Sequence, residues 1–145
     1  MKLLYRAIIV DFDRTLLHTD KTISEYTKTI FAKLHEKGIR MFAATARPER
    51  AICTYMEQIA FDAVTTLNGA RTIVNEQVYE NTIGKDSALS ILKQLIAIPD
   101  MIISIEAVGG LYANTEIPEW NPMVPESLTE ICETEGVYKF SNFAA

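Results

Sequence analysis

A chain of 145 residues suits one domain, or one domain and part of a second. Its net charge of −5 and the lack of any basic run exclude nucleic acid as the expected partner. No apolar run is long enough to cross a bilayer, so we expect no membrane partner. Cys53 and Cys132 lack the spacing of a metal site, which favours two reduced thiols in a cytoplasmic protein.

The first half of the chain alternates strand and helix patterns. This order predicts an α/β fold, a Rossmann-like parallel sheet with right-handed crossovers. The first strand is an almost unbroken apolar run, typical of a strand buried on both faces. The expected elements are a strand over Leu3–Asp11, a helix capped by Ser24 and ended by Gly38, a strand over Ile39–Ala44, a helix beginning near Pro48, and a strand over Ala63–Leu67.

The second half has the pattern of a smaller α+β domain. We place a domain boundary near Asn81–Lys85, which gives expected domains over 1–81 and 82–145. The expected elements are hairpin strands Arg71–Val74 and Gln77–Glu80 before the boundary, then a helix capped by Ser87 and ended by Pro99, hairpin strands Met101–Val108 and Leu111–Asn114, and a short helix over Ser127–Glu135.

Polar side chains follow each of the three predicted parallel strands. Asp11 and Asp13 come after the first strand, Thr45 and Arg47 after the second, and Asn68 after the third. Because the carboxyl ends of parallel strands meet at one edge of the sheet, these groups should line one crevice. Two carboxylates placed two residues apart also need a bound cation or a shared proton to offset their repulsion.

This set of groups is suited to phosphate-ester hydrolysis. Asp11 would attack phosphorus, and Asp13 would protonate the leaving oxygen and later deprotonate the attacking water. Thr45 would hydrogen-bond a phosphoryl oxygen, while Arg47 would bind phosphate bidentately. Mg²⁺, held by Asp11 and the backbone carbonyl of Asp13, would neutralise negative charge.

Three motifs carry a resemblance to a known superfamily. Residues 11–16, Asp-Phe-Asp-Arg-Thr-Leu, resemble the first motif of the haloacid dehalogenase-like hydrolases, Asp-x-Asp-Gly-Thr-[Leu/Val], with Arg14 in place of Gly. Residues 45–47, Thr-Ala-Arg, are similar to the Thr-Gly-Arg of the Cof-like branch, with Ala46 in place of Gly. Residues 68–70, Asn-Gly-Ala, match a segment that follows the third strand in that branch.

The resemblance implies a magnesium-dependent phosphohydrolase that works through a phosphoaspartate. By this analogy Asp11, Asp13 and Thr45 are catalytic, Asp11 and Asp13 hold the metal, and Arg47, Asn68 and Gly69 bind the substrate. Members of the branch insert a mobile α/β cap domain after the third strand, and many act on sugar phosphates or other small phosphorylated metabolites. Residues 86–114 look like the opening of such a cap.

The resemblance covers roughly the first half of such a phosphatase. The Lys of the third motif and the acidic pair of the fourth have no counterpart here, and no Asp follows Asp100. A truncation, a frameshift or a split protein would each produce this pattern. We therefore expect weak Mg²⁺ binding and impaired catalysis. We also expect a homo-oligomer, because the first strand would lie at an exposed sheet edge.

Two alternatives from other classes remain open. A catalytically inactive remnant would bind phosphate or a partner chain, and a receiver-like phosphoacceptor domain would share the strand-end aspartates. Each candidate residue also has a structural interpretation: Asp11 and Asp13 as a turn cap, Thr45 as a backbone partner, Arg47 as a surface charge, and Asn68-Gly69 as a turn. His18 and His35 have no metal partners at suitable spacing.

Overall fold

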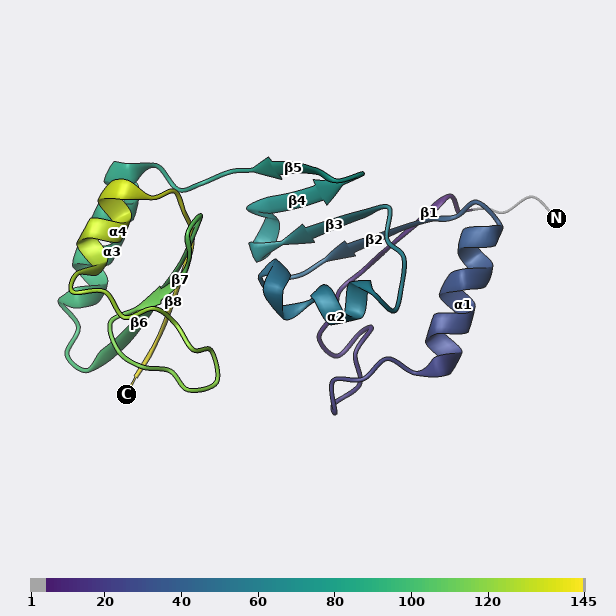
Figure 1. Cartoon of the computed structure of the whole chain (residues 1–145), viewed down its shortest axis with the longest axis horizontal. Coiled ribbons are helices and arrows are strands. Elements are labelled where there is room, and N and C mark those ends of the chain that lie inside the picture. Colours follow the sequence, from purple (N-terminus) through teal and green to yellow (C-terminus); the bar gives the residue numbers. More distant parts are fainter. Residues whose placement is uncertain (1–4, 145) are drawn as a thin grey trace. The chain divides into compact units, whose positions relative to one another are not determined.

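The computed structural model describes residues 5–144, and the chain divides into two compact units, Met1–Glu80 and Asn81–Ala145 (Figure 1). Each unit has its own sheet and its own apolar core. The separate cores follow from the sequence, because each half carries its own set of amphipathic helices and apolar strands.

The first unit is built on a five-stranded mixed sheet. Strands β1, β2 and β3 run parallel, and β4 and β5 extend the sheet as an antiparallel hairpin, in the order β1-β2-β3-β4-β5 (Figure 1). The α/β fold that the sequence predicts is thus confirmed. The strands cover Ala7–Val10 (β1), Arg40–Ala44 (β2), Ala63–Thr66 (β3), Arg71–Val74 (β4) and Gln77–Glu80 (β5).

The helices of this unit differ in how well the sequence pattern predicts them. Helix α1, Glu25–Glu36, is capped by Ser24, whose Oγ accepts the Thr27 amide hydrogen at 3.0 Å, and it ends before Gly38 at φ +74°. The second helix is much shorter than its apolar stripe suggests. A 3₁₀ turn at Glu49–Ala51 precedes α2, which spans only Cys53–Met56.

Strand β1 corrects the expectation of a strand buried on both faces. Residues 3 and 4 of the predicted strand lie outside the described range, and Ile9 is 72% exposed. The reason is that Ile9 points to the face of the sheet that has no buried core, whereas Ile8 and Val10, which point to the other face, are half-buried. Strand β1 also lies at the sheet edge, with β2 as its partner. The edge position itself agrees with the sequence prediction, which expected the first strand at an exposed sheet edge because the resemblance covers only the first half of such a phosphatase.

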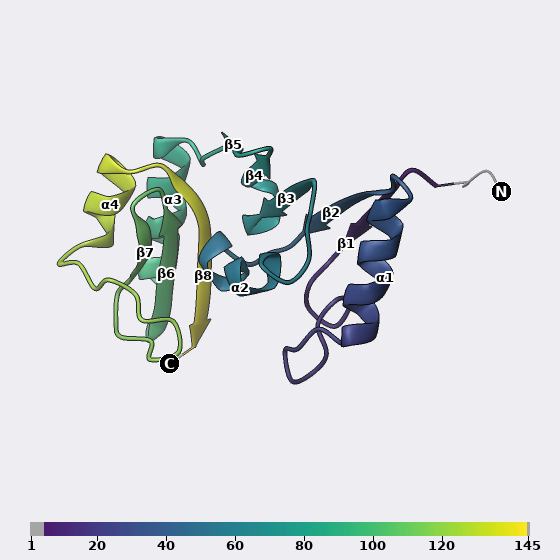
Figure 2. The ribbon, with the colours of Figure 1, turned by 45° about the vertical axis from the view of Figure 1, so that its right-hand side comes forward.

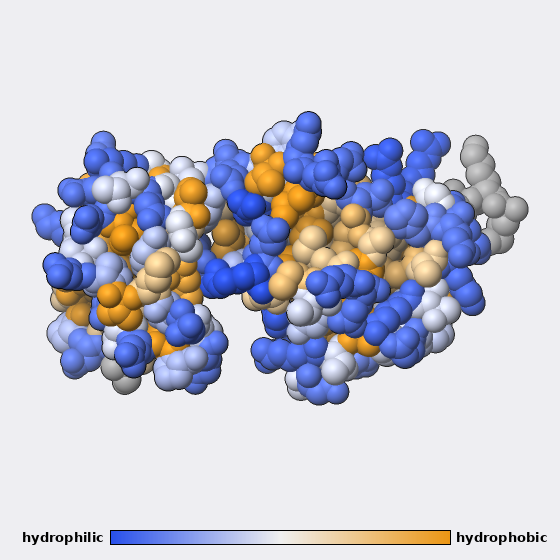
Figure 3. All heavy atoms as spheres, viewed as in Figure 1, coloured by the Kyte–Doolittle hydropathy of each residue, from blue (hydrophilic) through white to orange (hydrophobic). Residues whose placement is uncertain are grey.

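Successive side chains of a strand point to opposite faces of a sheet, and only one face of this sheet has a buried core. On the covered face one row of side chains runs through Val10, Ala43 and Val64. Ala43 and Val64 belong to the core cluster, and the half-buried Val10 packs against it. The opposite face is called the open face here. The row of neighbouring side chains on it is Ile9, Phe42, Ala63 and Val74, and none of the four is buried. Apolar atoms gather over the part of this unit where Figure 1 places β3 and β4 (Figure 3).

The second unit is an α+β sandwich of two layers. Helices α3 and α4 lie against one face of a three-stranded antiparallel sheet of order β7-β6-β8 (Figure 2). Its core cluster includes Leu92, Ile105 and Val137, each at most 1% exposed. The elements cover Lys85–Ile96 (α3), Met101–Ala107 (β6), Gly110–Ala113 (β7), Leu128–Thr134 (α4) and Val137–Ala144 (β8).

Two details of the second unit differ from the sequence prediction. Ser87 lies inside α3, because the helix begins at Lys85 after Gly84, so the predicted cap is wrong. Strand β8 is absent from the prediction, although it is the longest strand described. Its sequence, Val-Tyr-Lys-Phe-Ser-Asn-Phe-Ala, does not alternate between polar and apolar residues, and the segment forms a strand by pairing with β6, which is remote in sequence.

Candidate active site

Phe12 sets the geometry of the loop that follows β1. Its side chain is fully buried, and its ring packs against Tyr55 and Phe61 with centroid distances of 5.8 and 6.1 Å. Asp11 and Asp13, its two neighbours, are both exposed. Burying the aromatic residue therefore presents the two carboxylates to solvent beyond the end of the strand.

Backbone hydrogen bonds close this loop tightly. The Leu16 amide donates to the Asp11 carbonyl at 3.1 Å, and the Leu17 amide donates to the Phe12 carbonyl at 2.8 Å. Arg14 lies inside this turn with φ +57°, in the left-handed region where a side chain other than Gly is strained. The turn thus requires at position 14 a conformation that glycine adopts without cost.

Thr45 joins the loops that follow β2 and β3. Its side chain is 6% exposed, its amide donates to the Thr65 carbonyl at 2.9 Å, and its carbonyl accepts the Asn68 amide at 3.2 Å. Its hydroxyl oxygen accepts the Arg47 amide at 3.2 Å. The structural interpretation of Thr45 as a backbone partner is therefore observed, and it places the threonine between the second and third candidate motifs.

The third candidate segment is a left-handed turn. Leu67, Asn68 and Gly69 follow one another with φ of +52°, +58° and +101°. Asn and Gly tolerate this region, whereas Leu is strained in it. This turn is hydrogen-bonded to the loop after β2, because the Leu67 amide donates to the Arg47 carbonyl at 3.1 Å.

An open pocket joins four of the six predicted site residues. Asp11, Thr45, Asn68 and Gly69 line it, from the ends of all three parallel strands. Its volume of about 540 Å³ is in the range of roughly 300–1,000 Å³ that is typical of small-molecule sites. The remaining lining residues, which the sequence analysis did not propose, are Ala44, Ala46 and Thr65.

The structure brings Asp13 and Arg47 together, but as an ion pair with each other and not as two groups lining the pocket. Arg47 Nε donates to Asp13 Oδ2 at 2.8 Å, and Arg47 Nη2 donates to Asp13 Oδ1 at 2.5 Å. The guanidinium also lies over the Tyr55 ring, 5.9 Å from its centroid. The two side chains are absent from the lining of the Asp11 pocket, so the paired state withholds both groups from a ligand there.

The electrostatics of this pair follow from its geometry. The hydrogen bonds from Arg47 lower the pKa of the Asp13 carboxyl below its ordinary value of 3.8, against a smaller opposing effect of burial. The same hydrogen bond raises the pKa of Arg47. A carboxyl in this state is ionised at neutral pH, so it can accept a proton but carries none to donate.

The donor set suits part of a magnesium site. Mg²⁺ prefers oxygen ligands and keeps several waters when proteins bind it. Asp11 offers an exposed carboxylate in the pocket, and the backbone carbonyl of Asp13 follows two residues later. Within residues 5–144, no cluster of three or more Asp, Glu, His or Cys side chains offers a fuller site. The Asp11 carboxylate and the Asp13 carbonyl fit Mg²⁺, and together they would fill two of its six coordination positions.

Arg71 is a residue of this region that sequence reasoning missed. Its Nε donates to Glu49 Oε2 at 3.1 Å, and it also pairs with Glu80 on β5. Glu49 opens the turn after Arg47, so this ion pair links the second loop to β4. The 22-residue separation of Arg71 and Glu49 leaves no local pattern by which a sequence could signal it.

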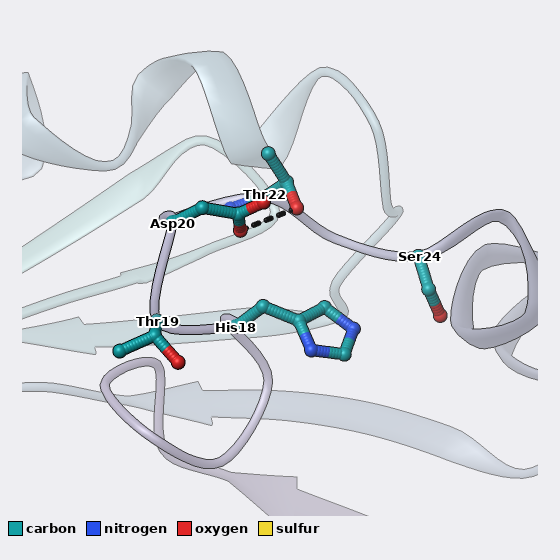
Figure 4. A pocket seen from close by; sticks show the side chains of 5 residues that line it. All are labelled: His18, Thr19, Asp20, Thr22 and Ser24. Carbon is teal, nitrogen blue, oxygen red and sulfur yellow. Dashed lines mark hydrogen bonds between the residues drawn. The ribbon is translucent and has the colours of Figure 1, made fainter.

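A second hollow lies further along the first loop (Figure 4). Asp20 Oδ1 accepts hydrogen bonds from the Thr22 amide at 3.1 Å and the Thr22 hydroxyl at 2.7 Å. The imidazole of His18 extends from the opposite side of the turn toward Ser24 (Figure 4). His18 therefore lies on a loop, as predicted, and Asp20 acts as the cap of its turn.

None of the helices in the described range combines the length and the apolar character that spanning a membrane requires.

Curated relatives match most of the chain at low identity. A protein of Haemophilus influenzae is 24% identical over 131 residues, which are 88% of this chain and 48% of the relative. A protein of Buchnera aphidicola is 29% identical over 114 residues, 77% of this chain and 42% of the relative. Both carry the name "Putative phosphatase". The chain thus spans about half the length of these relatives.

Solved structures agree on the fold. The Bacteroides thetaiotaomicron protein BT1666, a phosphatase of the haloalkanoate (HAD) enzyme superfamily, superposes with a TM-score of 0.80 at 20% identity, over 95% of this chain and 55% of its own. The sugar phosphatase BT4131 superposes with a TM-score of 0.73 at 19% identity, over 95% of this chain and 58% of its own.

A family model shows which family the chain belongs to. The model of the haloacid dehalogenase-like hydrolases matches residues 8–142, which include all three candidate loops and nearly all of the second unit. The sequence motifs, the strand-end pocket and the superposed folds point the same way. The chain belongs to the haloacid dehalogenase-like hydrolase family.

Proposed function

We propose that the first unit carries the nucleophile and phosphate-binding part of a Cof-type phosphohydrolase site. The observation that carries this proposal is the shared pocket, in which Asp11, Thr45, Asn68 and Gly69 come together from three strand ends. A carboxylate beside a hydroxyl, an amide and a glycine backbone is suited to a phosphate group. The substrate would be a small phosphorylated metabolite or a sugar phosphate.

In this mechanism an Asp11 oxygen attacks phosphorus, the bond to the ester oxygen breaks, and Asp13 in its protonated form would give its proton to that leaving oxygen. Thr45 and Asn68 would hydrogen-bond the phosphoryl oxygens during the transfer. Water would then attack phosphorus, Asp13 would accept a proton from that water, and the bond between Asp11 and phosphorus would break to release phosphate. Mg²⁺ bound at Asp11 would supply neutralising charge.

The Asp13–Arg47 pair would have to open for this reaction. Arg47 would leave Asp13 to bind the phosphate bidentately, and the carboxyl would lose the hydrogen bonds that lower its pKa. Its pKa would then rise, which favours the protonated form that a general acid needs. The pair is therefore proposed as the resting state of the site.

Turnover is expected to be low. The third-motif Lys and the fourth-motif acidic pair of the resemblance have no counterpart in the sequence. Removing one group that stabilises transition-state charge costs about 10²–10³ in rate. We propose that the expected domains 1–81 and 82–145 represent part of the hydrolase core and part of a cap. We also propose a cytoplasmic location for the protein.

Hydrolysis of an aryl phosphate in MgCl₂ tests the enzyme interpretation. We expect turnover at least about 10²-fold below that of a full-length relative, lost in Asp11→Asn. Asp86→Asn, which removes an exposed carboxylate from the first turn of α3, is the matched control and should retain it. Turnover that survives Asp11→Asn would contradict the proposed nucleophile.

The second candidate is a phosphate-binding module without turnover. The ionised, Arg-paired state of Asp13 favours it, because this state holds no proton for a leaving group. It predicts no hydrolysis, together with saturable phosphate-induced changes in the amide NMR signals of residues 44–46 and 68–69.

A further inference from the structure

The loop after the proposed nucleophile contains a hollow that the proposed hydrolase chemistry does not use. Its volume is about 320 Å³, and it is separate from the Asp11 pocket, with which it shares no lining residue. All but one of its lining residues come from the single segment 14–19, and Thr27 of α1 completes it. It adjoins the hollow of Figure 4, because His18 and Thr19 line both.

Each of the polar side chains that line this hollow can donate a hydrogen bond. Arg14 contributes a permanent cation, His18 an imidazole, and Thr15 and Thr19 contribute hydroxyls. Among residues 5–144, these four side chains have no hydrogen-bond partner. Exposed donors that converge on one hollow can all turn toward the same ligand.

No carboxylate lines the hollow. The two nearest acidic residues in sequence make their hydrogen bonds elsewhere: Asp13 accepts from the guanidinium of Arg47, and Asp20 accepts from the amide and hydroxyl of Thr22. Their charges still attract the side chains of the hollow, because Asp13 interacts electrostatically with Arg14 and Asp20 with His18. Lys21 is exposed beside them and adds positive charge to the loop. The lining of the hollow therefore carries one permanent cation, Arg14, and no carboxylate.

The backbone at Arg14 is a second, independent observation. An arginine held at φ +57° is strained by about 1–2 kcal/mol relative to the right-handed region. Glycine or asparagine would occupy this position at lower cost. Strain of this kind is retained most often where the side chain has a task, and here the strained side chain is the cation of the hollow.

We propose that Arg14, His18, Thr15 and Thr19 form a binding site for a phosphate-class oxyanion, distinct from the Asp11 pocket. A guanidinium recognises such an anion through two parallel hydrogen bonds, and hydroxyls supply single donors to the remaining oxygens. Thr27 lies in the first turn of α1, whose positive dipole end adds to the field. The site does not depend on hydrolysis at Asp11.

Amide NMR signals of the full chain, titrated with sodium phosphate, test the site. The reference titration uses sodium chloride at equal ionic strength. We expect saturable changes at residues 14–19 with phosphate and not with chloride. Changes confined to residues 44–46 and 68–69, or equal changes with chloride, would overturn the proposal and would leave the Asp11 pocket to be judged separately.

Substitutions of Arg14 test whether its side chain recognises the phosphate. Arg14→Asn tolerates the left-handed backbone but removes the cation, and it should weaken phosphate binding by at least about tenfold, the loss expected for a charge-assisted hydrogen bond. Arg14→Lys keeps the charge without the fork and should bind with intermediate affinity. Arg40→Asn, at an exposed position of β2, removes the same charge elsewhere and should change the affinity less than twofold.

His18→Asn provides a second line of evidence, because His18 has an ordinary loop position with no strain to relieve. It should weaken binding measurably while Arg40→Asn does not. If neither Arg14→Asn nor His18→Asn alters the phosphate-induced changes at residues 14–19, the proposed ligand set is wrong.

Discussion

Arg47 binds both carboxylate oxygens of Asp13, although the two residues are 34 positions apart in the chain. The arrangement joins the loop after β1 to the loop after β2 and leaves Asp11 as the unpaired carboxylate in the strand-end pocket. The two aspartates of the first motif thus have different environments. This difference underlies the separate roles proposed for them, because Asp13 is paired with Arg47 whereas Asp11 lines the pocket.

The first prediction concerns the titration of Asp13. Arg47→Gln should raise the pKa of the Asp13 carboxyl toward 3.8, because the hydrogen bonds that lower it are removed. NMR of the carboxyl carbon over an acid titration measures this directly. Arg40→Gln, a charge change at another exposed site of the same unit, should leave the Asp13 titration nearly unchanged.

The same pair gives a sign for the pH dependence of stability. Because the folded-state pKa of Asp13 lies below 3.8, its contribution is present above that pH and is lost as the pH falls through the folded value. The contribution should be at most about 1 kcal/mol, since the Asp13 side chain is 54% exposed. Urea unfolding at pH 7 and pH 3 checks it: a difference between wild type and Arg47→Gln that grows at pH 3 would contradict this sign.

The second prediction concerns the strained turn. Arg14→Gly should stabilise the first unit by a few tenths to about 1 kcal/mol, because relief of left-handed strain exceeds the entropy that glycine adds to the unfolded chain. The midpoint of urea unfolding measures the change. Thr15→Gly is the matched control, because Thr15 has no positive φ, and it should destabilise. A destabilised Arg14→Gly would mean that Arg14 makes offsetting contacts in the folded protein.

The third prediction concerns magnesium. With the Asp11 carboxylate and one backbone carbonyl as proposed ligands, affinity should be in roughly the millimolar range or weaker, since most positions stay with water. Calorimetry with MgCl₂ tests this, and Asp11→Asn should remove the binding that remains. Micromolar affinity would require ligands beyond those that residues 5–144 bring together in one cluster.

The fourth prediction concerns self-association. Strand β1 is an edge strand, and Ile9 on it is 72% exposed at the end of the open face. Unpaired edge groups and exposed apolar side chains favour association with a second copy. We expect light scattering to show a dimer or larger species, and Ile9→Lys to shift it toward monomer by placing a charge on the edge.

Tyr26→Lys is the control for this experiment. Tyr26 is 77% exposed, on helix α1 rather than on the sheet edge. The substitution adds the same charge but should leave the assembly unchanged. A monomeric wild-type protein, or equal effects of the two substitutions, would show that the β1 edge does not mediate association.

Local sequence was sufficient where neighbouring residues decide the conformation. The β4–β5 hairpin occupies its predicted strands, because Asn75 and Glu76 form a turn with φ of +48° and +67°. Ser24 caps α1 as expected, because its hydroxyl reaches an amide three residues away. The three candidate loops follow their strands for the same reason: each strand ends where a short polar segment begins.

Contacts between distant residues decided the rest. Strand β8 forms only against β6, and Ile9 is exposed because its face of the sheet has no buried core. An apolar run specifies that a segment prefers burial, but it carries no information on how many neighbours are available to cover it. The sequence by itself determined the family motifs and the strand ends on which they lie. Only the tertiary structure paired Asp13 with Arg47 and left Asp11 in the pocket, because hydrogen bonds across 34 residues depend on how the strands are arranged in space.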